Sequence, residues 1–344
     1  MDPITYKDAG VDIDAGDEVV RRIGPLARAT ARPEVLNGIG AFAAFVRVPA
    51  GFREPVLVSS TDGVGSKLKV AFMADRHTTV GIDLVAMGVN DLLVHGAEPL
   101  YFLDYVAVAR VDPARIEAIV GGVAEGCRRA GCALVGGETA ELPDLYAAGG
   151  EYDLAGFAVG VVERARIIDG GAVKPGDRVL GLASSGLHSN GYSLARRIVF
   201  DVLRCQVDSL FPGTGRSVAD ELLEPTRIYA SAVKALLEGV PVAAMAHVTG
   251  SGLTGNVPRV LPEGCRAVIS RGAWTIPPVF EVLREAGRVA DAEMFRTFNM
   301  GIGYVVIVDR DAAERTVGLL TRAGETVYAL GEVVAGSRGV ELVP

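Results

Sequence analysis

The residues best suited to chemistry lie in one short run, Ser59-Ser60-Thr61-Asp62-Gly63-Val64-Gly65-Ser66-Lys67, which follows an apolar extended segment. Its carboxylate, Asp62, could hold a magnesium ion. Backbone amides beside glycines can approach a phosphate closely, and a lysine ammonium can bind the same oxygens. The run is not the G-x-x-x-x-G-K-[ST] phosphate loop, which occurs nowhere in the chain. It therefore predicts magnesium–phosphate chemistry on another scaffold.

A second group of polar residues lies in an apolar segment, residues 82–95, which we expect to form a buried helix. A buried carboxylate is costly unless it is paired or binds a metal. Asp91 lies in mid-helix, where it cannot act as a cap, so we interpret it as a metal ligand. Asp83 fits an N-terminal cap or a partner of the helix dipole slightly better than direct ligation. Asp83 and Asn90 share one helix face, offset by about 20°.

The run Gly136-Gly137-Glu138-Thr139 follows a predicted strand at 133–135. Glycines here allow close approach of a ligand, and the acid and the hydroxyl could meet magnesium or a ribose. A plain turn from strand to loop, with solvated acids, explains the same residues equally well. The run by itself does not decide between these two interpretations.

Two more glycine-rich turns carry hydroxyl, imidazole and amide groups. The first, residues 184–192, precedes a predicted helix, and loop amides beside a helix N-terminus can bind phosphate. Capping by Ser189 or Asn190 is the alternative, but the turn is more polar than a cap requires. The second turn, residues 247–256, repeats the order of strand, glycine turn and helix and is weak evidence by itself.

The four histidines divide into two kinds. His188 and His247 lie in the glycine-rich turns, where acid–base or hydrogen-bonding roles are plausible. His77 and His95 lie near predicted helix ends and fit structural roles. No pair of histidines has the spacing of a zinc site, and neither a G-x-S-x-G elbow nor a signature of a nucleophilic cysteine occurs. Covalent catalysis is therefore not favoured.

Composition narrows the class of protein. The 344 residues are 49% hydrophobic and 22% charged, which is typical of a well-packed globular protein with two domains. The net charge of −8 argues against nucleic acid or an anionic membrane as the main partner. No secretory signal or membrane-spanning run is visible, and the four cysteines form no C-x-x-C pair. We therefore expect a cytoplasmic protein with reduced thiols.

The elements that position these residues alternate between strands and helices. We expect little regular structure in the first fifty residues, and then a helix from Pro113 to Gly131 between strands at 101–110 and 152–162. A turn at 173–177 places a boundary near residue 170, so the predicted domains are 1–170 and 171–344. For the second domain we predict helices near 190–204, 225–238, 277–286 and 311–323 and strands near 179–183, 242–247, 266–270, 303–309 and 326–334.

Together these segments resemble the phosphoribosylformylglycinamidine cyclo-ligase family, also called aminoimidazole ribonucleotide synthetases. The matches run in order along essentially the whole chain, and eight motifs in register are a specific signal. They are residues 5–13, 62–67, 81–87, 90–91 with 96–99, 136–141, 188–192, 247–250 and 295–301.

The resemblance implies an α+β fold of two mixed α/β domains. The N-terminal sheet would join that of a second copy in a shared barrel, as a homodimer, and the C-terminal domain would have a mixed sheet with flanking helices. The implied reaction uses ATP and Mg²⁺ to close formylglycinamidine ribonucleotide to aminoimidazole ribonucleotide in purine biosynthesis, releasing ADP and phosphate. Phosphorylation would turn the formamide oxygen into a leaving group, a step that needs positioning and charge neutralisation more than covalent help.

Residue roles follow from the same resemblance. Asp62 and Asp91 would hold magnesium. ATP and its phosphates would contact Asp62, Gly63, Gly65, Ser66, Lys67, Gly136, Gly137, Glu138 and Thr139. The substrate would contact Ser189, Asn190, Gly191, Thr249, Gly250 and Gly252. The catalytic candidates are His188, His247 and Lys67.

The chain departs from the family pattern at a few positions. Serine stands at 66 and 251, where threonine and glycine are usual, and several relatives in the wider superfamily carry an acid where His247 lies and paired acids where Gly40 lies. The alternatives are another ATP-using member of that superfamily and a non-catalytic nucleotide-binding module. Selenophosphate synthesis needs an N-terminal cysteine, whereas the first cysteine here is Cys127. The retained acids, lysine and glycine turns argue against the module.

Overall fold

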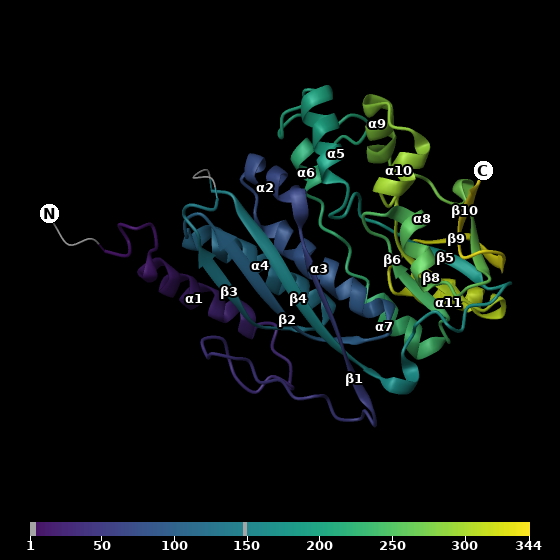
Figure 1. The fold of residues 1–344 in the computed structure, drawn as a ribbon, viewed down its shortest axis with the longest axis horizontal. Helices are drawn as coiled ribbons and strands as arrows, with labels where there is room; N and C mark the ends of the chain where they lie inside the picture. Colours follow the sequence, from purple (N-terminus) through teal and green to yellow (C-terminus); the bar gives the residue numbers. More distant parts are fainter. Residues whose placement is uncertain (1–4, 147–149) are drawn as a thin grey trace.

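The computed structural model describes residues 5–146 and 150–344, which form two α/β units, each built on one sheet (Figure 1). The strands are β1 Pro55–Gly63, β2 Glu98–Val108, β3 Ala133–Glu141, β4 Tyr152–Glu163, β5 Arg178–Ala183, β6 Ala244–His247, β7 Cys265–Ser270, β8 Ile302–Val308, β9 Val327–Ala335 and β10 Gly339–Val343. The helices are α1 Ile13–Arg28, α2 Leu68–Ala74, α3 Thr78–Val94, α4 Pro113–Ala130, α5 Tyr192–Arg196, α6 Val218–Leu222, α7 Ala230–Gly239, α8 Gly252–Asn256, α9 Pro278–Gly287, α10 Asp291–Thr297 and α11 Ala313–Arg322.

The N-terminal unit is a sheet with the strand order β1-β4-β2-β3. β4 is antiparallel to β1 and β2, whereas β3 runs parallel to β2. α3 and α4 pack against each other and against the sheet. The predicted helix α4 is confirmed, with its ends set as the sequence indicates: Asp112 caps its first amides, Pro113 opens it, and Gly131 ends it in the left-handed conformation.

Two expectations for the N-terminal part are wrong. Residues 13–28, which we expected to be loosely structured, form the helix α1, which is capped by Asp12 and packs on α4. Its apolar side, on which Val19 and Ala27 are buried, has a helical period in the sequence that the expectation of a loose segment overlooked. Gly136 and Gly137, which we placed in a turn, lie inside β3.

The C-terminal unit is a mixed sheet with the strand order β10-β7-β9-β5-β8-β6, in which β10 is parallel to β7 and the other neighbours are antiparallel. Its predicted strands are found within one to two residues of their expected starts. The helix predicted at 225–238 begins only at Ala230, because residues 224–229 form neither helix nor strand. The boundary that we placed near residue 170 falls between β4 and β5.

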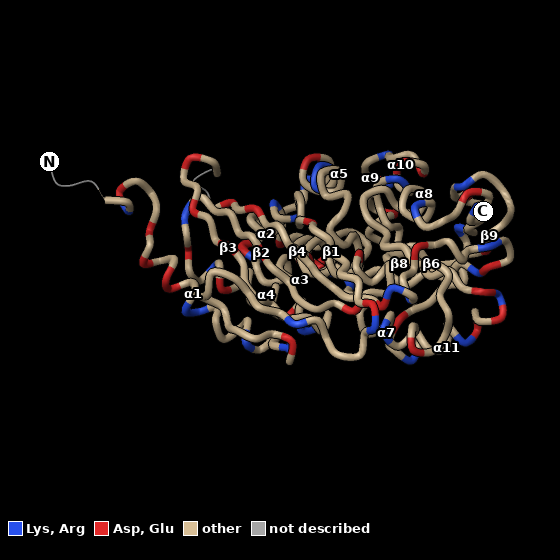
Figure 2. The backbone as a smooth tube through the Cα atoms, turned by 60° about the horizontal axis from the view of Figure 1, so that its bottom comes forward, with Lys and Arg blue, Asp and Glu red and all other residues tan. Residues whose placement is uncertain are grey.

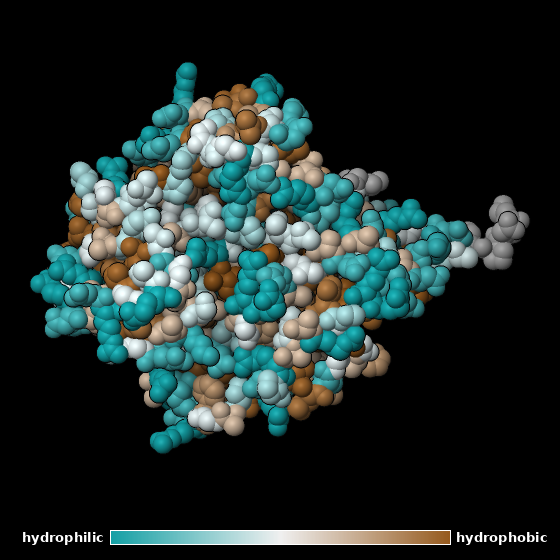
Figure 3. All heavy atoms as spheres, turned by 180° about the vertical axis from the view of Figure 1, so that it is seen from behind, coloured by the Kyte–Doolittle hydropathy of each residue, from teal (hydrophilic) through white to brown (hydrophobic). Residues whose placement is uncertain are grey.

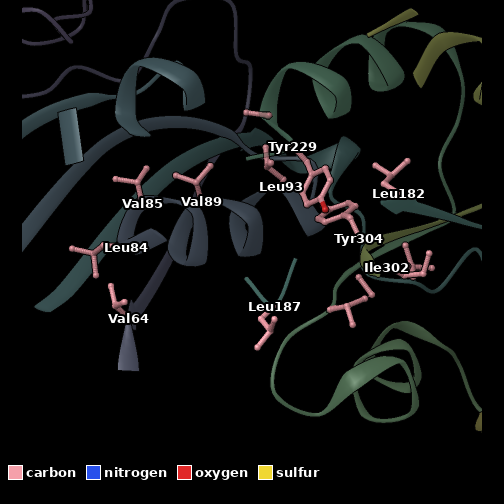
Figure 4. Close-up of a cluster of buried hydrophobic side chains, with 14 of the residues drawn as sticks. Val64, Leu84, Val85, Val89, Leu93, Leu182, Leu187, Tyr229, Ile302 and Tyr304 are labelled. Atoms are coloured by element: carbon pink, nitrogen blue, oxygen red, sulfur yellow. The ribbon is translucent and has the colours of Figure 1, made fainter. Parts of the chain in front are cut away.

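α3 joins the two units. It is buried along almost its whole length because it packs against α4, β1 and β4 of the N-terminal unit and also against β6 of the C-terminal unit. Figure 4 shows the apolar cluster at this junction, which combines α3 residues such as Val89 and Leu93 with Tyr229 and Tyr304 of the C-terminal unit. The rings of Tyr229 and Tyr304 have centroids 5.1 Å apart. The junction is thus a continuous core, and it fixes how the two units meet.

Charges of both signs are interspersed along the chain (Figure 2). The face seen from behind is a mosaic of hydrophilic and apolar residues (Figure 3). No helix in the described part of the chain is long and apolar enough to cross a membrane.

Candidate active site

Three predicted site residues meet where the two units join. Asp62 lies at the end of β1, Asp91 in α3, and His247 at the end of β6. The Nδ1 atom of His247 lies 2.9 Å from an oxygen of Asp91, whose other oxygen accepts a hydrogen bond from the Ser60 hydroxyl at 3.3 Å. Burial raises the pKa of the Asp62 carboxyl, and the nearby Asp91 carboxylate raises it further. The mid-helix acid and the strand-end acid are therefore neighbours.

This pair of acids fits a magnesium ion. Two carboxylates that are close enough to raise a pKa repel each other, and a hard cation between them removes that repulsion with the oxygen ligands it prefers. About half of the Asp91 side chain is exposed, which leaves an open side for water or phosphate. Within the described residues, no group of three or more His, Cys, Asp or Glu side chains is arranged to hold a metal by itself. A cation here would take part of its coordination from a bound ligand.

Lys67 does not lie at the surface, where a phosphate could reach it. Its side chain is completely buried, and its ammonium lies 2.8 Å from an Asp83 oxygen. It also donates to the backbone carbonyls of His188, at 3.0 Å, and Glu224, at 2.6 Å. Burial lowers the pKa of this ammonium, while the Asp83 carboxylate opposes the shift. Because these three contacts use all the protons of the ammonium, Lys67 connects α3 to the C-terminal unit and has no proton left for a phosphate.

The interpretation of Asp83 as a cap is wrong. α3 begins at Thr78, so Asp83 lies inside the helix, and its buried carboxylate is paired with Lys67 and Thr226. Asn90 lies on the same face, as the seven-residue spacing predicted. Its side chain bonds the carbonyl of Arg227 and the amide of Tyr229. Asp83 and Asn90 on this face of α3 therefore hold the 224–229 segment of the C-terminal unit by hydrogen bonds.

The two candidate histidines have different hydrogen-bonding states. His188 is fully buried, burial lowers the pKa of its imidazole, and Nε2 accepts the Ser185 amide at 3.2 Å. The proton of this neutral ring therefore sits on Nδ1. His247 faces the Asp91 carboxylate through Nδ1, so its proton points there and Nε2 carries the lone pair. His188 Nδ1 and His247 Nε2 are both buried without a partner in the described part of the chain.

The predicted substrate turns lie next to each other. A Cβ built on Gly250 would lie 3.4 Å from the amide oxygen of Asn190. Gly252 has a φ of +57°, and a side chain there would collide with backbone oxygens of Phe295 and Phe298. The Ser66 hydroxyl of the N-terminal unit lies 3.1 Å from that of Ser193, which follows the first turn. The nucleotide loop and the substrate turns therefore come together at the junction.

The glycines at 136 and 137 lie farther away. The sheet register places Asp62, Gly156, Asp104 and Gly137 in one row. Three strand spacings of about 4.8 Å separate the ends of this row by about 14 Å. A Cβ on Gly137 would lie 1.6 Å from a carboxylate oxygen of Asp104, so packing alone demands a glycine at this position. Only an extended ligand could touch both ends of the row.

Several residues that shape the site escaped the sequence interpretation. Asn256 holds the second turn, through its side-chain bonds to the amide and hydroxyl of Thr249. Asn299 bonds the Gly186 carbonyl and the Ser184 hydroxyl of the first turn. Thr226 was assigned to a helix, because Pro225 fits the first position of a helix that begins there. Asn299 carries no local signal, because Ser184 and Gly186 are 115 and 113 residues away, whereas Asn256 is seven residues from Thr249 in the same predicted turn.

Comparison with known proteins gives matches along the chain. Residues 40–162 match the family described as "AIR synthase related protein, N-terminal domain", and residues 174–343 match the corresponding C-terminal domain. Proteins named phosphoribosylformylglycinamidine cyclo-ligase from Citrifermentans bemidjiense and Myxococcus xanthus are 56% and 55% identical to it. The first alignment covers 99% of this chain and 98% of the relative, and the second covers 96% of each.

Solved structures share the fold at low sequence identity. The thiamine-monophosphate kinase of Stenotrophomonas maltophilia has a TM-score of 0.69 and 19% identity, over 93% of this chain and 95% of its own. The hydrogenase maturation protein HypE in complex with ATP has a TM-score of 0.65 and 19% identity, over 94% of this chain and 90% of its own. These likenesses concern the architecture alone.

Proposed function

The chain belongs to the phosphoribosylformylglycinamidine cyclo-ligase family, and on this premise we propose that its active site is the junction of Asp62, Asp91 and His247. The protein is an ATP-dependent ligase of purine biosynthesis that converts formylglycinamidine ribonucleotide to aminoimidazole ribonucleotide. The observation that supports this location is the contact between the Asp91 carboxylate of the N-terminal unit and the His247 imidazole of the C-terminal unit.

In this proposal Asp62 and Asp91 hold Mg²⁺, which neutralises phosphate charge when it is bound. The Gly65 amide and the Ser66 hydroxyl bind phosphate oxygens, because β1 ends there and a short helical turn begins. The Gly63 amide, which we expected to bind phosphate, donates to the Asp62 carboxylate at 2.8 Å and orients it. Gly136, Gly137, Glu138 and Thr139 contact the other end of the extended nucleotide, about 14 Å along the sheet. Lys67 has a positioning role, since its ammonium is bonded inside the protein.

The chemistry proceeds by transfer of the γ-phosphoryl group to the formamide oxygen. The amidine nitrogen then attacks the activated carbon, the ring closes, the C–O bond breaks and phosphate leaves. His247 is suited to accept the proton that the nitrogen loses, because Asp91 orients its ring and Nε2 carries the lone pair. His188 is suited to donate a hydrogen bond from Nδ1 without changing charge. The turns around Asn190 and Thr249 hold the substrate against these groups.

We also propose a homodimer whose N-terminal sheets close a shared barrel. The sheet face opposite α3 exposes large apolar side chains, with Leu57 56% and Phe157 44% accessible. A sheet face of this kind is a liability in water unless another surface covers it. The cytoplasmic location expected from the sequence remains a prediction.

The test of the assigned reaction is release of ADP by the purified protein with ATP and Mg²⁺. We expect ADP to appear only when formylglycinamidine ribonucleotide is present, together with one aminoimidazole ribonucleotide per ADP. Omitting Mg²⁺ should stop turnover. Release of ADP that ignores the ribonucleotide, or no turnover with it, would contradict the proposal.

A further inference from the structure

The 224–229 segment crosses between the two units and is bonded along its length. Lys67 donates to the Glu224 carbonyl, the Ser185 hydroxyl donates to the Pro225 carbonyl at 2.6 Å, and Asn90 binds the residues at the far end. Thr226, in the middle, is only 1% exposed. The segment is therefore fixed to α3 on one side and to the first substrate turn on the other.

Thr226 connects a buried charge to that turn. Its amide and its hydroxyl donate to one oxygen of Asp83, at 2.7 and 2.6 Å. The same hydroxyl oxygen lies 3.1 Å from the hydroxyl of Ser189, which is half-buried in the turn. Asp83 also forms an ion pair with the buried Lys67 ammonium, at 2.8 Å. These contacts form one chain of groups from Lys67 to Ser189.

The chemistry of the groups fixes the direction of each proton in this chain. An ionised carboxylate accepts hydrogen bonds and cannot donate one. The single hydroxyl proton of Thr226 goes to Asp83, so toward Ser189 the Thr226 oxygen can only accept. The single hydroxyl proton of Ser189 must then go to Thr226. What Ser189 has left for a ligand is the lone pairs of its oxygen.

We propose that Ser189 accepts a hydrogen bond from the amidine nitrogen of the substrate, and that Asp83 and Thr226 are positioning residues that impose this polarity. The inference rests on the proposed function and makes it more specific. An oxygen that can only accept gains nothing from a phosphate or formyl oxygen, which also only accepts. The amidine carries N–H donors and is the group whose nitrogen closes the ring, so among the donors of the substrate it is the one that this oxygen is proposed to recognise. Ser189 thus distinguishes the amidine from the corresponding amide, which has a carbonyl oxygen at that place.

The experiment compares two ligands in the presence of Mg²⁺ and a non-hydrolysable ATP analogue. They are formylglycinamidine ribonucleotide and its amide analogue, in which oxygen replaces the amidine nitrogen. Calorimetry gives both dissociation constants for each protein. Two acceptors that face each other lose a hydrogen bond and repel, so the wild type should bind the amide about ten- to a hundredfold more weakly.

Thr226→Val keeps the volume and removes the hydroxyl, so Ser189 can turn its proton toward the ligand. We expect the preference for the amidine to fall about tenfold, and Ser189→Ala to lose it similarly. Thr226→Ser retains a hydroxyl that can donate to Asp83 and accept from Ser189, so this variant should keep the preference for the amidine. Thr316→Val is a matched control, because this buried hydroxyl donates to the carbonyl of Ala312, the residue before α11, far from Ser189 in the chain. It should leave the preference unchanged.

The outcomes separate two kinds of failure. If Thr226→Val binds both ligands and keeps the wild-type preference, Ser189 does not read the amidine and the inference is overturned, while the proposed function stands. If the wild type binds neither ribonucleotide, the proposed function fails and the inference falls with it. If Thr226→Ser keeps the preference and Thr226→Val loses it, the hydroxyl of residue 226, and not its packing, is the cause.

Discussion

The Lys67 ammonium and the Asp83 carboxylate form an ion pair of 2.8 Å in which neither side chain is exposed. The pair connects the end of the nucleotide loop to α3, and Lys67 continues to two carbonyls of the C-terminal unit. Loop, helix and substrate turn are thus held by one ammonium. A displacement of any of the three would leave a buried charge without a partner.

Lys67→Met should destabilise the protein more than any single exposed charge change. Removing one member of a buried ion pair leaves the other uncompensated and costs about 3–5 kcal/mol. The double variant Lys67→Met/Asp83→Asn removes both charges, and we expect it to recover at least half of that loss. Urea unfolding of the two variants and the wild type measures both effects.

The control for this comparison is Lys69→Met. Lys69 is also paired with a carboxylate, that of Glu151, but the two side chains are 44% and 35% exposed, so water screens the pair. We expect only a small change. If the double variant is less stable than Lys67→Met alone, the two residues do not compensate each other, and the description of the pair is wrong.

Asp104 should make the stability of the protein depend on pH in neutral solution. Burial raises the pKa of this carboxyl from 3.8 to about 7, and one of its oxygens is buried without a partner in the described residues. Between those two values the folded protein keeps a proton that the unfolded chain has lost. The free energy of unfolding therefore falls as pH rises, by up to about 1.4 kcal/mol per pH unit, and levels off above the folded pKa.

Asp104→Asn isolates this contribution, because the amide has the shape of the protonated acid. The variant should be as stable as the wild type in acid and increasingly more stable up to about pH 7. Thermal unfolding of both proteins at a series of pH values gives the difference, in which other titrating groups cancel. A constant difference across the series would show that Asp104 does not titrate in this range.

Features of the structure that depend on residues close together in the sequence were predicted, and features that depend on distant residues were not. Asp112, Pro113 and Gly131 specify α4 through contacts within a few residues, and its position was predicted. Asp83 was misassigned because its partners, Lys67 and Thr226, are brought to it by the meeting of two units. We assigned Lys67 to phosphate binding for the same reason, because the sequence does not show that partners from both units bury its side chain.

The candidate site shows the same division. A metal-binding role for Asp91 was expected from its place in a buried helix, whereas its pairing with Asp62 was implied only by the family resemblance. The contact of Asp91 with His247, 156 residues away, has no local signal. Gly137 is a different case. We interpreted this glycine as a nucleotide contact, but a side chain there would also collide with Asp104.

Asp91→Asn should abolish most of the activity and keep the fold. The amide can still accept the His247 proton, but it has no charge to attract Mg²⁺. We expect kcat to fall at least about a hundredfold, with weaker Mg²⁺ activation. Asp201→Asn, at an exposed acid on the C-terminal unit, is the control and should have wild-type kinetics. Full activity of Asp91→Asn would refute a role in metal binding.

Phe157→Asp should separate the proposed dimer without unfolding its subunits. Phe157 lies on β4, and its neighbour Gly156 faces Leu84 of α3, so the alternation of a strand turns Phe157 to the uncovered face of the sheet. A carboxylate there costs little in a monomer, because the side chain is 44% exposed, and much in a buried apolar interface. In sedimentation equilibrium we expect the wild type at about twice the subunit mass of 35.9 kDa and the variant near the subunit mass. Val202→Asp, at an apolar side chain that is 54% exposed on the C-terminal unit, should remain dimeric. A dimer that survives Phe157→Asp unchanged would show that this face of the sheet is not the interface.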